Sequence, residues 1–197
     1  GANTKVGDKG STNSVGQSIA IGSSQGNGAW AKGTQAIAIG SDTIAEGDSS
    51  VVIGGDDIDR AISKTKSYVK KSYDKNDTET STAVNNQSLD DIYKDLTGNT
   101  SGLGGYRGTT AGEASVALGV KAAAGDLATA LGTMSEAKGI NSLALGTGAL
   151  ATQANAVAVG AGSSTEGLKA KRITDASIAL ADRSEERRVG KECTSWC

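Results

Sequence analysis

Small and large aliphatic residues alternate along most of the chain, in short stretches that end in glycine. The pattern small, aliphatic, small, aliphatic, Gly occurs seven times, and the usual distance from one terminal glycine to the next is 14 residues. The terminal glycines are Gly22, Gly40, Gly54, Gly119, Gly132, Gly146 and Gly160. An eighth copy, Ser177–Ala181, ends in alanine. Because side chains alternate between the two faces of a strand, each copy predicts a short β-strand.

A second glycine divides most of these repeats in half. It lies seven residues before a terminal glycine, at Gly33, Gly47, Gly125 and Gly139. We expect both kinds of glycine to serve turns that need a positive φ or a close approach of two backbones. One such unit cannot bury its apolar face alone, whereas stacked copies can, so the sequence predicts a parallel β-roll with two short strands in each turn.

The alternation also gives each strand a large face and a small face. We expect the isoleucine, leucine and valine side chains to form the core, and the central alanines to face outward. These alanines are Ala38, Ala117, Ala130, Ala144 and Ala158. An outward stripe without bulk or charge favours close approach by another chain and therefore an oligomer, with an exposed surface of small residues as the alternative.

Composition narrows the function classes. The chain has 28 glycines and only six aromatic residues, yet 37% hydrophobic residues and a net charge of −2 are not typical of a disordered chain. The absence of histidine excludes Ser-His-Asp chemistry and histidine-ligated metals. A net charge near zero gives no case for a nucleic-acid partner, and no apolar run is long enough for a membrane helix. We therefore expect no catalysis, no cofactor and no metal.

The repeat is interrupted between Gly54 and Gly119 by about 51 extra residues, at positions 55–105. Apolar side chains recur there at helical spacing, first at Ile58, Ile62, Thr65, Val69 and Tyr73 and then at Leu89, Ile92 and Leu96. Ser88 with Asp91 three residues later is typical of a helix N-terminus. The sequence predicts a helix–loop–helix insertion with a polar linker over Asp74–Gln87.

An insertion that breaks a regular rod is a natural place for a contact surface. Three of the four tyrosines lie in it, among lysines. The ligand-binding candidates are Lys66, Tyr68, Lys70, Tyr73 and Tyr93, together with Trp30, which lies in an irregular repeat. The alternatives are that the helices pack as a spacer and that Trp30 covers the side of the roll.

Several repeats carry a family resemblance. Asn141–Gly146, Asn155–Ser163 and Gln17–Gly22 resemble the N-S-V-A-I-G-x-x-S hallmark of the YadA-like heads of trimeric autotransporter adhesins. The resemblance implies a homotrimeric, left-handed parallel β-roll at the surface of a Gram-negative-type bacterium, used for attachment. The repeats place residues 1–54 and 106–181 in the roll, and Lys171–Thr174 faintly resembles the neck that follows such heads.

These observations together predict an adhesin head. We expect multivalent binding to host matrix proteins, host glycoproteins or other bacteria, with no nucleic acid and no membrane contact from this chain. We also expect the chain to be part of a larger secreted and anchored protein, with residues 182–197 as a non-native or disordered tail containing Cys193 and Cys197. The alternatives are a carbohydrate-active β-solenoid enzyme, which needs clustered carboxylates, and a passive stalk spacer.

Overall fold

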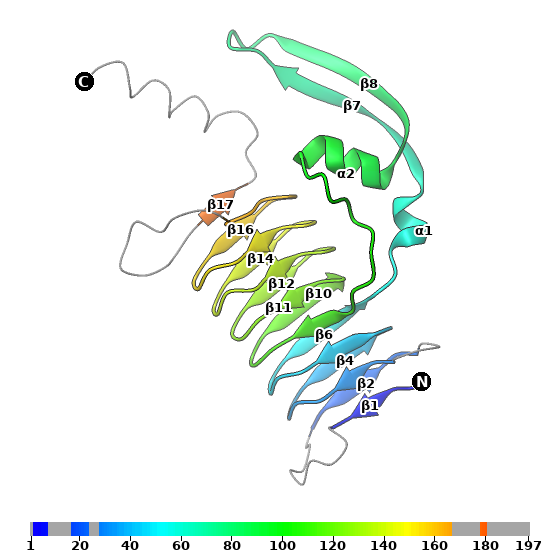
Figure 1. Ribbon diagram of the computed structural model, residues 1–197, viewed down its shortest axis with the longest axis vertical. Helices are drawn as coiled ribbons and strands as arrows, with labels where there is room; N and C mark the ends of the chain where they lie inside the picture. Colours follow the sequence, from blue (N-terminus) through cyan, green and yellow to red (C-terminus); the bar gives the residue numbers. More distant parts are fainter. Residues whose placement is uncertain (1, 8–16, 24–27, 167–177, 181–197) are drawn as a thin grey trace, which may run out of the picture. The chain divides into compact units, whose positions relative to one another are not determined.

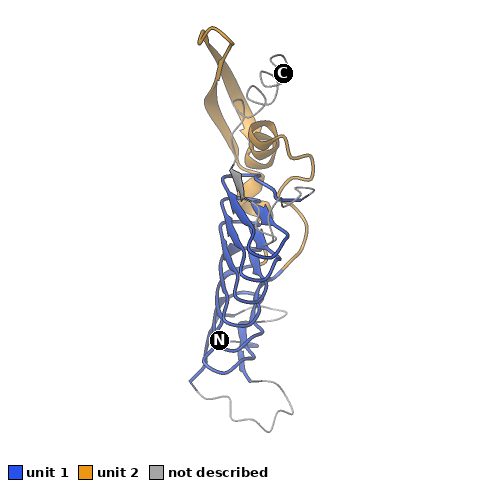
Figure 2. Cartoon of the chain, turned by 90° about the vertical axis from the view of Figure 1, so that its left-hand side faces the viewer, with its two compact units in different colours: residues 1–55, 108–197 blue, residues 56–107 orange. Residues whose placement is uncertain are grey.

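The computed structural model describes residues 2–7, 17–23, 28–166 and 178–180, the last three by their backbone alone. The chain divides into two compact units, coloured separately in Figure 2. We call Gly1–Gly55 with Gly108–Cys197 the roll, and Asp56–Arg107 the insertion. The predicted tail, the neck-like segment Lys171–Thr174 and both cysteines lie outside the described residues.

The first sheet of the roll is built from the repeated motif itself. It has eight strands in the order β17-β16-β14-β12-β10-β6-β4-β2, and every neighbouring pair is parallel (Figure 1). The strands are β2 (Ile19–Ile21), β4 (Ile37–Gly40), β6 (Val51–Gly55), β10 (Val116–Val120), β12 (Thr129–Leu131), β14 (Leu143–Leu145), β16 (Val157–Val159) and β17 (Ile178–Leu180). Each of the eight motif copies therefore forms one strand, as predicted.

The second sheet has seven strands of two or three residues, which come from the other half of each repeat. Its order is β1-β3-β5-β9-β11-β13-β15, and it is also parallel throughout. The strands are β1 (Lys5–Val6), β3 (Trp30–Ala31), β5 (Thr43–Ala45), β9 (Thr109–Ala111), β11 (Ala123–Ala124), β13 (Glu136–Ala137) and β15 (Leu150–Ala151). The predicted all-β parallel roll with two strands per turn is confirmed.

The two kinds of glycine have the two roles expected of them. Gly146 ends its motif with a φ of +125°, which side chains other than hydrogen rarely tolerate. Gly139, the half-period glycine, has no positive φ, but a Cβ there would overlap the backbone of Gln153 in the next turn. Stacking at this closeness is possible only without a side chain.

The prediction for the two strand faces was wrong, because the alanines form the core. Ala38, Ala117, Ala130, Ala144 and Ala158 are fully buried, and the core cluster of the roll consists of alanines with Val52 as its one larger member among the described residues. The large aliphatic side chains point outward, so that Ile21 is 58% exposed and Ile53 43%. Two short strands joined by tight turns enclose a narrow lumen that alanine fills at normal packing density, with Val52 as the one larger apolar side chain described there.

The insertion contains α1 (Asp59–Ile62), β7 (Thr65–Tyr73), β8 (Glu79–Ser88) and α2 (Leu89–Thr97). The second predicted helix is confirmed as α2. The first predicted helix was wrong except for the short α1, because its remaining residues form β7. β7 and β8 form an antiparallel hairpin, and most of the predicted linker belongs to β8. Thr65, Val69 and Tyr73 are four residues apart, and this spacing also fits one face of a strand.

The insertion replaces part of one turn and leaves the stacking register intact. In the preceding turn, two residues separate Gly40 from Thr43, whereas the chain between Gly54 and Thr109 contains Gly55, the whole insertion and Gly108. The hydroxyl of Thr109 donates to the carbonyl of Gly55 at 2.8 Å, as that of Thr43 does to Gly40 at 3.4 Å. The strands before and after the insertion, β6 and β10, still pair Gly54 with Gly119.

Candidate binding surfaces

Trp30 is held by contacts within the roll. It lies half-buried in β3, and its indole Nε1 donates to the carbonyl of Gly7 at 2.9 Å. The ammonium groups of Lys5 and Lys32 are 4.8 and 4.4 Å from the ring centroid, within the range of cation–π attraction. The contacts join the first described strand, β1, to its neighbour, which agrees with the alternative that Trp30 covers the side of the roll.

Tyr68 and Lys70 fasten the hairpin to the helix that follows it. They lie on the same face of β7, and both contact the carboxylate of Asp95 on α2. The Tyr68 hydroxyl donates to Oδ2 at 2.6 Å, and the Lys70 ammonium lies 2.7 Å from Oδ1. These two candidates therefore come together, with an acidic partner that sequence reasoning did not identify.

The opposite face of the hairpin is open to solvent. Val69 and Tyr73 are 58% and 60% exposed there. Glu79, across from Tyr73 in the register, accepts a hydrogen bond from the Tyr73 hydroxyl at 2.8 Å and lies 2.9 Å from the Lys71 ammonium. The Lys71 and Tyr73 contacts lower the pKa of Glu79, and the hydrogen bond to Glu79 raises the pKa of Tyr73.

Lys66, near the base of the hairpin, is exposed. Its ammonium group makes no hydrogen bond or ion pair to any residue that the structure describes. Of the six sequence candidates, Lys66 and Tyr73 present the most accessible side chains.

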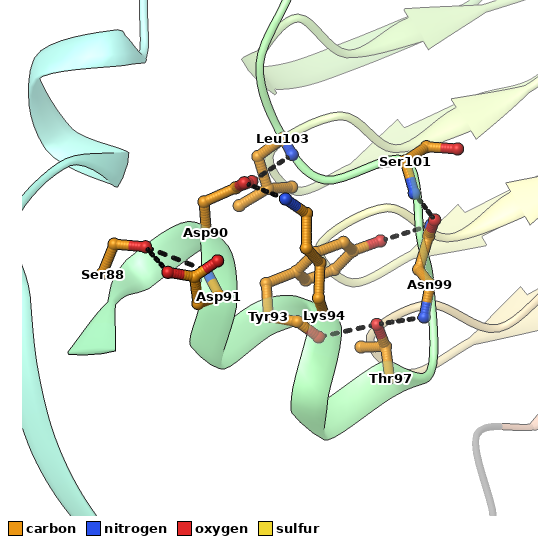
Figure 3. Close-up of polar contacts among 9 residues, drawn as sticks. All are labelled: Ser88, Asp90, Asp91, Tyr93, Lys94, Thr97, Asn99, Ser101 and Leu103. Carbon is orange, nitrogen blue, oxygen red and sulfur yellow. Dashed lines mark hydrogen bonds and ion pairs between the residues drawn. The ribbon is translucent and has the colours of Figure 1, made fainter. Parts of the chain in front are cut away.

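Tyr93 lies on the inner side of α2 and is only 7% exposed. Its hydroxyl accepts a hydrogen bond from the Asn99 side-chain amide at 3.0 Å, and its carbonyl accepts one from the Thr97 hydroxyl at 2.7 Å (Figure 3). The loop that follows α2 is thus folded back onto the helix, and Tyr93 packs between them.

Asp90 holds the other end of this loop. Its carboxylate lies 2.7 Å from the Lys94 ammonium, one helical turn away, and accepts the backbone N–H of Leu103 at 2.6 Å. The Lys94 contact and the Leu103 N–H lower the pKa of Asp90, and the same ion pair raises the pKa of Lys94. Figure 3 shows Asp90 between the helix and Leu103. Charged groups here stabilise the local fold.

The outer face of the eight-stranded sheet carries a continuous row of aliphatic side chains, which we call the aliphatic ladder. All its members are half-buried or exposed. They are Ile19, Ile21, Ile37, Ile39, Val51, Ile53, Val116, Leu118, Leu131, Leu143, Leu145, Val157 and Val159. Sequence reasoning missed this surface, because it placed these side chains in the core.

Acidic side chains stack at the same position of three successive turns of the roll and bond to the backbone of the neighbouring turn. The carboxylate of Asp48 accepts the N–H of Thr34 at 2.7 Å, Glu113 accepts that of Asp48 at 2.7 Å, and Asp126 accepts that of Glu113 at 3.0 Å. Within the described ranges, no three acidic or cysteine side chains converge to hold a metal ion. The helices of the same ranges include none of the length and apolar character needed to cross a membrane.

Comparison with known proteins gives one match. The sequence model of the YadA head domain repeat matches residues 25–56, 123–149 and 137–163. The first range contains β3, β4, β5 and β6, and the other two contain β11 to β16. No curated protein and no solved structure matched the chain.

Proposed function

Since the chain belongs to the YadA-like head domains of trimeric autotransporter adhesins, we propose that it is the homotrimeric head through which a Gram-negative-type bacterium attaches to host matrix proteins, host glycoproteins or other cells. The family consists of bacterial surface adhesins rather than enzymes. Three identical heads side by side, and many such trimers per cell, convert weak single contacts into strong attachment by multivalency.

The aliphatic ladder is the observation that carries the trimer. Soluble monomers rarely expose a contiguous apolar surface that runs through seven strands, and such surfaces mark interfaces. The ladder is in register from strand to strand, as in the row Leu118, Leu131, Leu145 and Val159. Three rolls that turn this face toward a common axis bury it together, which closed cyclic symmetry permits.

The trimer is tested by placing a charge on the ladder. We expect Leu131→Glu to reduce the trimer to monomers in sedimentation velocity and chemical cross-linking. The matched control is Leu127→Glu, because Leu127 is 58% exposed but lies outside the ladder, in a turn. A parent chain that is monomeric at micromolar concentration would contradict the proposal.

The exposed side of the insertion is the proposed ligand surface. Tyr73 is accessible there, and Val69 adds an apolar side chain on the same face. Lys66 is also accessible, near the base of the hairpin, on the face of Tyr68 and Lys70. Tyr68 and Lys70 support this surface from behind through Asp95, and Tyr93 anchors the helix. An exposed aromatic ring next to charged groups is typical of the residues that dominate binding energies.

The structure gives a clean deletion to test this surface. Removing residues 56–107 joins Gly55 to Gly108, so that two residues separate Gly54 from Thr109, as two separate Gly40 from Thr43. We expect the shortened chain to keep the β-rich spectrum and the trimer but to lose attachment to collagen, fibronectin, mucin or whole cells. Unchanged attachment would place the ligand site on the roll.

A pair of point variants refines the deletion. Tyr73→Ala is expected to weaken attachment about tenfold or more, as truncation of an aromatic contact residue does. Tyr106→Ala is the control, because Tyr106 is also in the insertion and 74% exposed but lies outside the hairpin. Equal losses in both variants would argue against a ligand surface on the hairpin.

A passive spacer is the second candidate, favoured by the contacts that Tyr68, Lys70 and Tyr93 make within the insertion. It predicts that both the parent and the deletion variant form trimers and attach to nothing. The enzyme alternative gains no support from the stacked carboxylates, because Asp48, Glu113 and Asp126 already accept backbone N–H groups. Hydrolysis of a glycan panel by the chain would revive it.

A further inference from the structure

The two strands of the hairpin differ in how their open edges are protected. In the described part of the chain they form a sheet of only two strands, so each has one edge without a partner strand. β7 carries Lys66, Lys70 and Lys71, and lysine is a common guard against edge-to-edge pairing. β8 has no charged residue after Glu79 and no proline, and its stretch Thr80–Val84 is uncharged and regular. A bulge at Asn85 and Asn86 ends this regular stretch.

The backbone groups on the open edge of β8 can be identified from the turn of the hairpin. The N–H of Asp74 donates to the carbonyl of Thr78, so these two residues are a hydrogen-bonded pair. Such pairs alternate along an antiparallel ladder, and the next are Ser72 with Thr80 and Lys70 with Thr82. The residues between them, Ser81 and Ala83, therefore direct their N–H and C=O groups away from β7.

We infer that the open edge of β8 pairs with the same edge of β8 in a second copy of this chain. The pairing is antiparallel and centred on Thr82, so that Ser81 of each copy lies opposite Ala83 of the other. In this register Glu79, the one charged residue of β8, lies opposite the uncharged Asn85, where the bulge of β8 begins. A parallel pairing in register would stack Glu79 on Glu79, and the lysines of β7 would repel one another.

Symmetry determines which copies pair. This step rests on the proposed trimer. A two-fold strand pair between two chains of one trimer would leave the third edge unpaired, so the pairing links different trimers. With three open edges on each trimer, one pair between two heads raises the effective concentration for the next. The partner is thus a second head of the same protein, and the surface serves contact between cells that display it.

The test uses the full chain with substitutions at one position. Ala83→Pro removes the outward N–H at the centre of the edge and leaves the hydrogen bonds to β7 in place, because proline is tolerated at an outward edge position. Ala83→Lys keeps the N–H but adds a guarding charge. Ala83→Val keeps the N–H and suits a strand, so it is the matched control.

Sedimentation velocity over a concentration series measures the step from trimers to larger assemblies, and mixed-bead aggregation with coated beads measures contact between surfaces. We expect the parent and Ala83→Val to associate alike, and Ala83→Pro and Ala83→Lys to do so at least about tenfold more weakly. All four are expected to remain trimers with the same circular dichroism, and Ala83→Lys decides the matter if Ala83→Pro fails to fold.

The inference is overturned if trimers of the parent do not associate at any concentration tested, or if both edge variants associate as the parent does. Attachment and trimer formation are read separately, so failure of the proposed function is distinguishable from failure of this pairing.

Discussion

The roll and the insertion are parts of one chain that fold by different means. In the roll, one short rule is repeated, and buried alanines, backbone pairing and turn glycines hold each turn on the next. In the insertion, few side chains are buried, and Tyr93 and Leu103 are its two buried apolar side chains. Individual contacts of Asp90, Asp95 and Glu79 hold its pieces together.

This difference implies opposite responses to substitution. The roll has no room in its core, so a change of size at one inner position disturbs the neighbouring turns as well. The insertion tolerates changes on its exposed hairpin but depends on a few polar contacts and on glycine at a tight position. The insertion can therefore change in sequence while the roll keeps its spacing.

The largest effect is expected inside the roll. Ala144 is fully buried and stacks between Ala130 and Ala158. Ala144→Leu should destabilise the roll by about 3 kcal/mol, because overpacking forces the strands apart. Chemical unfolding followed by circular dichroism measures the loss. The control is Ala83→Leu on the exposed hairpin, which should change stability by no more than about 0.5 kcal/mol. Equal losses of stability in the two variants would contradict the difference between roll and insertion.

The next effect tests the tight position in the insertion. Gly102 has a φ of +64°, and a Cβ there would lie 2.7 Å from Asp90 Oδ1 and from the Lys94 Cε. Gly102→Ala should loosen α2 and its loop by about 2 kcal/mol, seen as faster amide exchange there and unchanged exchange in the roll.

Gly98→Ala separates the cost of the positive φ from the cost of the close contact with Asp90 and Lys94. Gly98 has a φ of +71° but open space around the added methyl group. It should show the conformational cost alone, about 1 kcal/mol. A Gly102→Ala variant no worse than Gly98→Ala would mean that the contact with Asp90 and Lys94 is relaxed at no cost.

A smaller effect on stability, of opposite sign, is expected at a turn of the roll where leucine has a positive φ. Leu127 has a φ of +55°, at a turn position where the next two turns have Asn141 and Asn155. These asparagines bond through their side chains at 2.7 Å. Leu127→Asn should stabilise the roll by about 1 kcal/mol, since asparagine tolerates this conformation and leucine does not. The reverse change, Asn141→Leu, should destabilise it, and a gain there would contradict the explanation.

The smallest effect is a pH dependence confined to the insertion. Lys94 and the Leu103 N–H lower the pKa of Asp90 in the folded state. A lowered pKa adds stability that is present above the unfolded value, about 3.9, and is lost as the pH falls through the folded value. We expect the Leu103 amide to exchange faster below about pH 4 in the parent, by NMR. Asp90→Asn should remove this dependence, and an unchanged acid response in that variant would exclude Asp90 as its source.

The sequence predicted the secondary structure of the roll correctly, but not which face of each strand is buried. The period of the motif fixed the strands and turns, but alternation alone does not state which face is buried. The usual rule puts large apolar residues inside, and here it fails because the lumen between the two sheets accepts only small side chains. The aliphatic side chains are left on the outer face.

In the insertion, local signals were sufficient only for α2. Ser88 caps that helix by accepting the Asp91 N–H at 3.1 Å, and Gly98 ends it in the left-handed conformation, as local chemistry predicts. The apolar spacing of β7 fits a helix and a strand alike, and pairing with β8 decided between them. The contacts of Asp95 with Tyr68 and Lys70 join residues at least 25 positions apart, which no spacing rule reveals.

By itself, the sequence determined a stacked parallel roll, the place where it is interrupted and the family to which it belongs. It could do so because each copy of a repeated motif pairs with the next copy along the chain. Only the tertiary structure decided that alanine fills the core and that an aliphatic face lies outside. It also decided that the interruption is a hairpin with a helix. These features depend on the width of the lumen and on pairing between distant segments, and a local sequence pattern specifies neither.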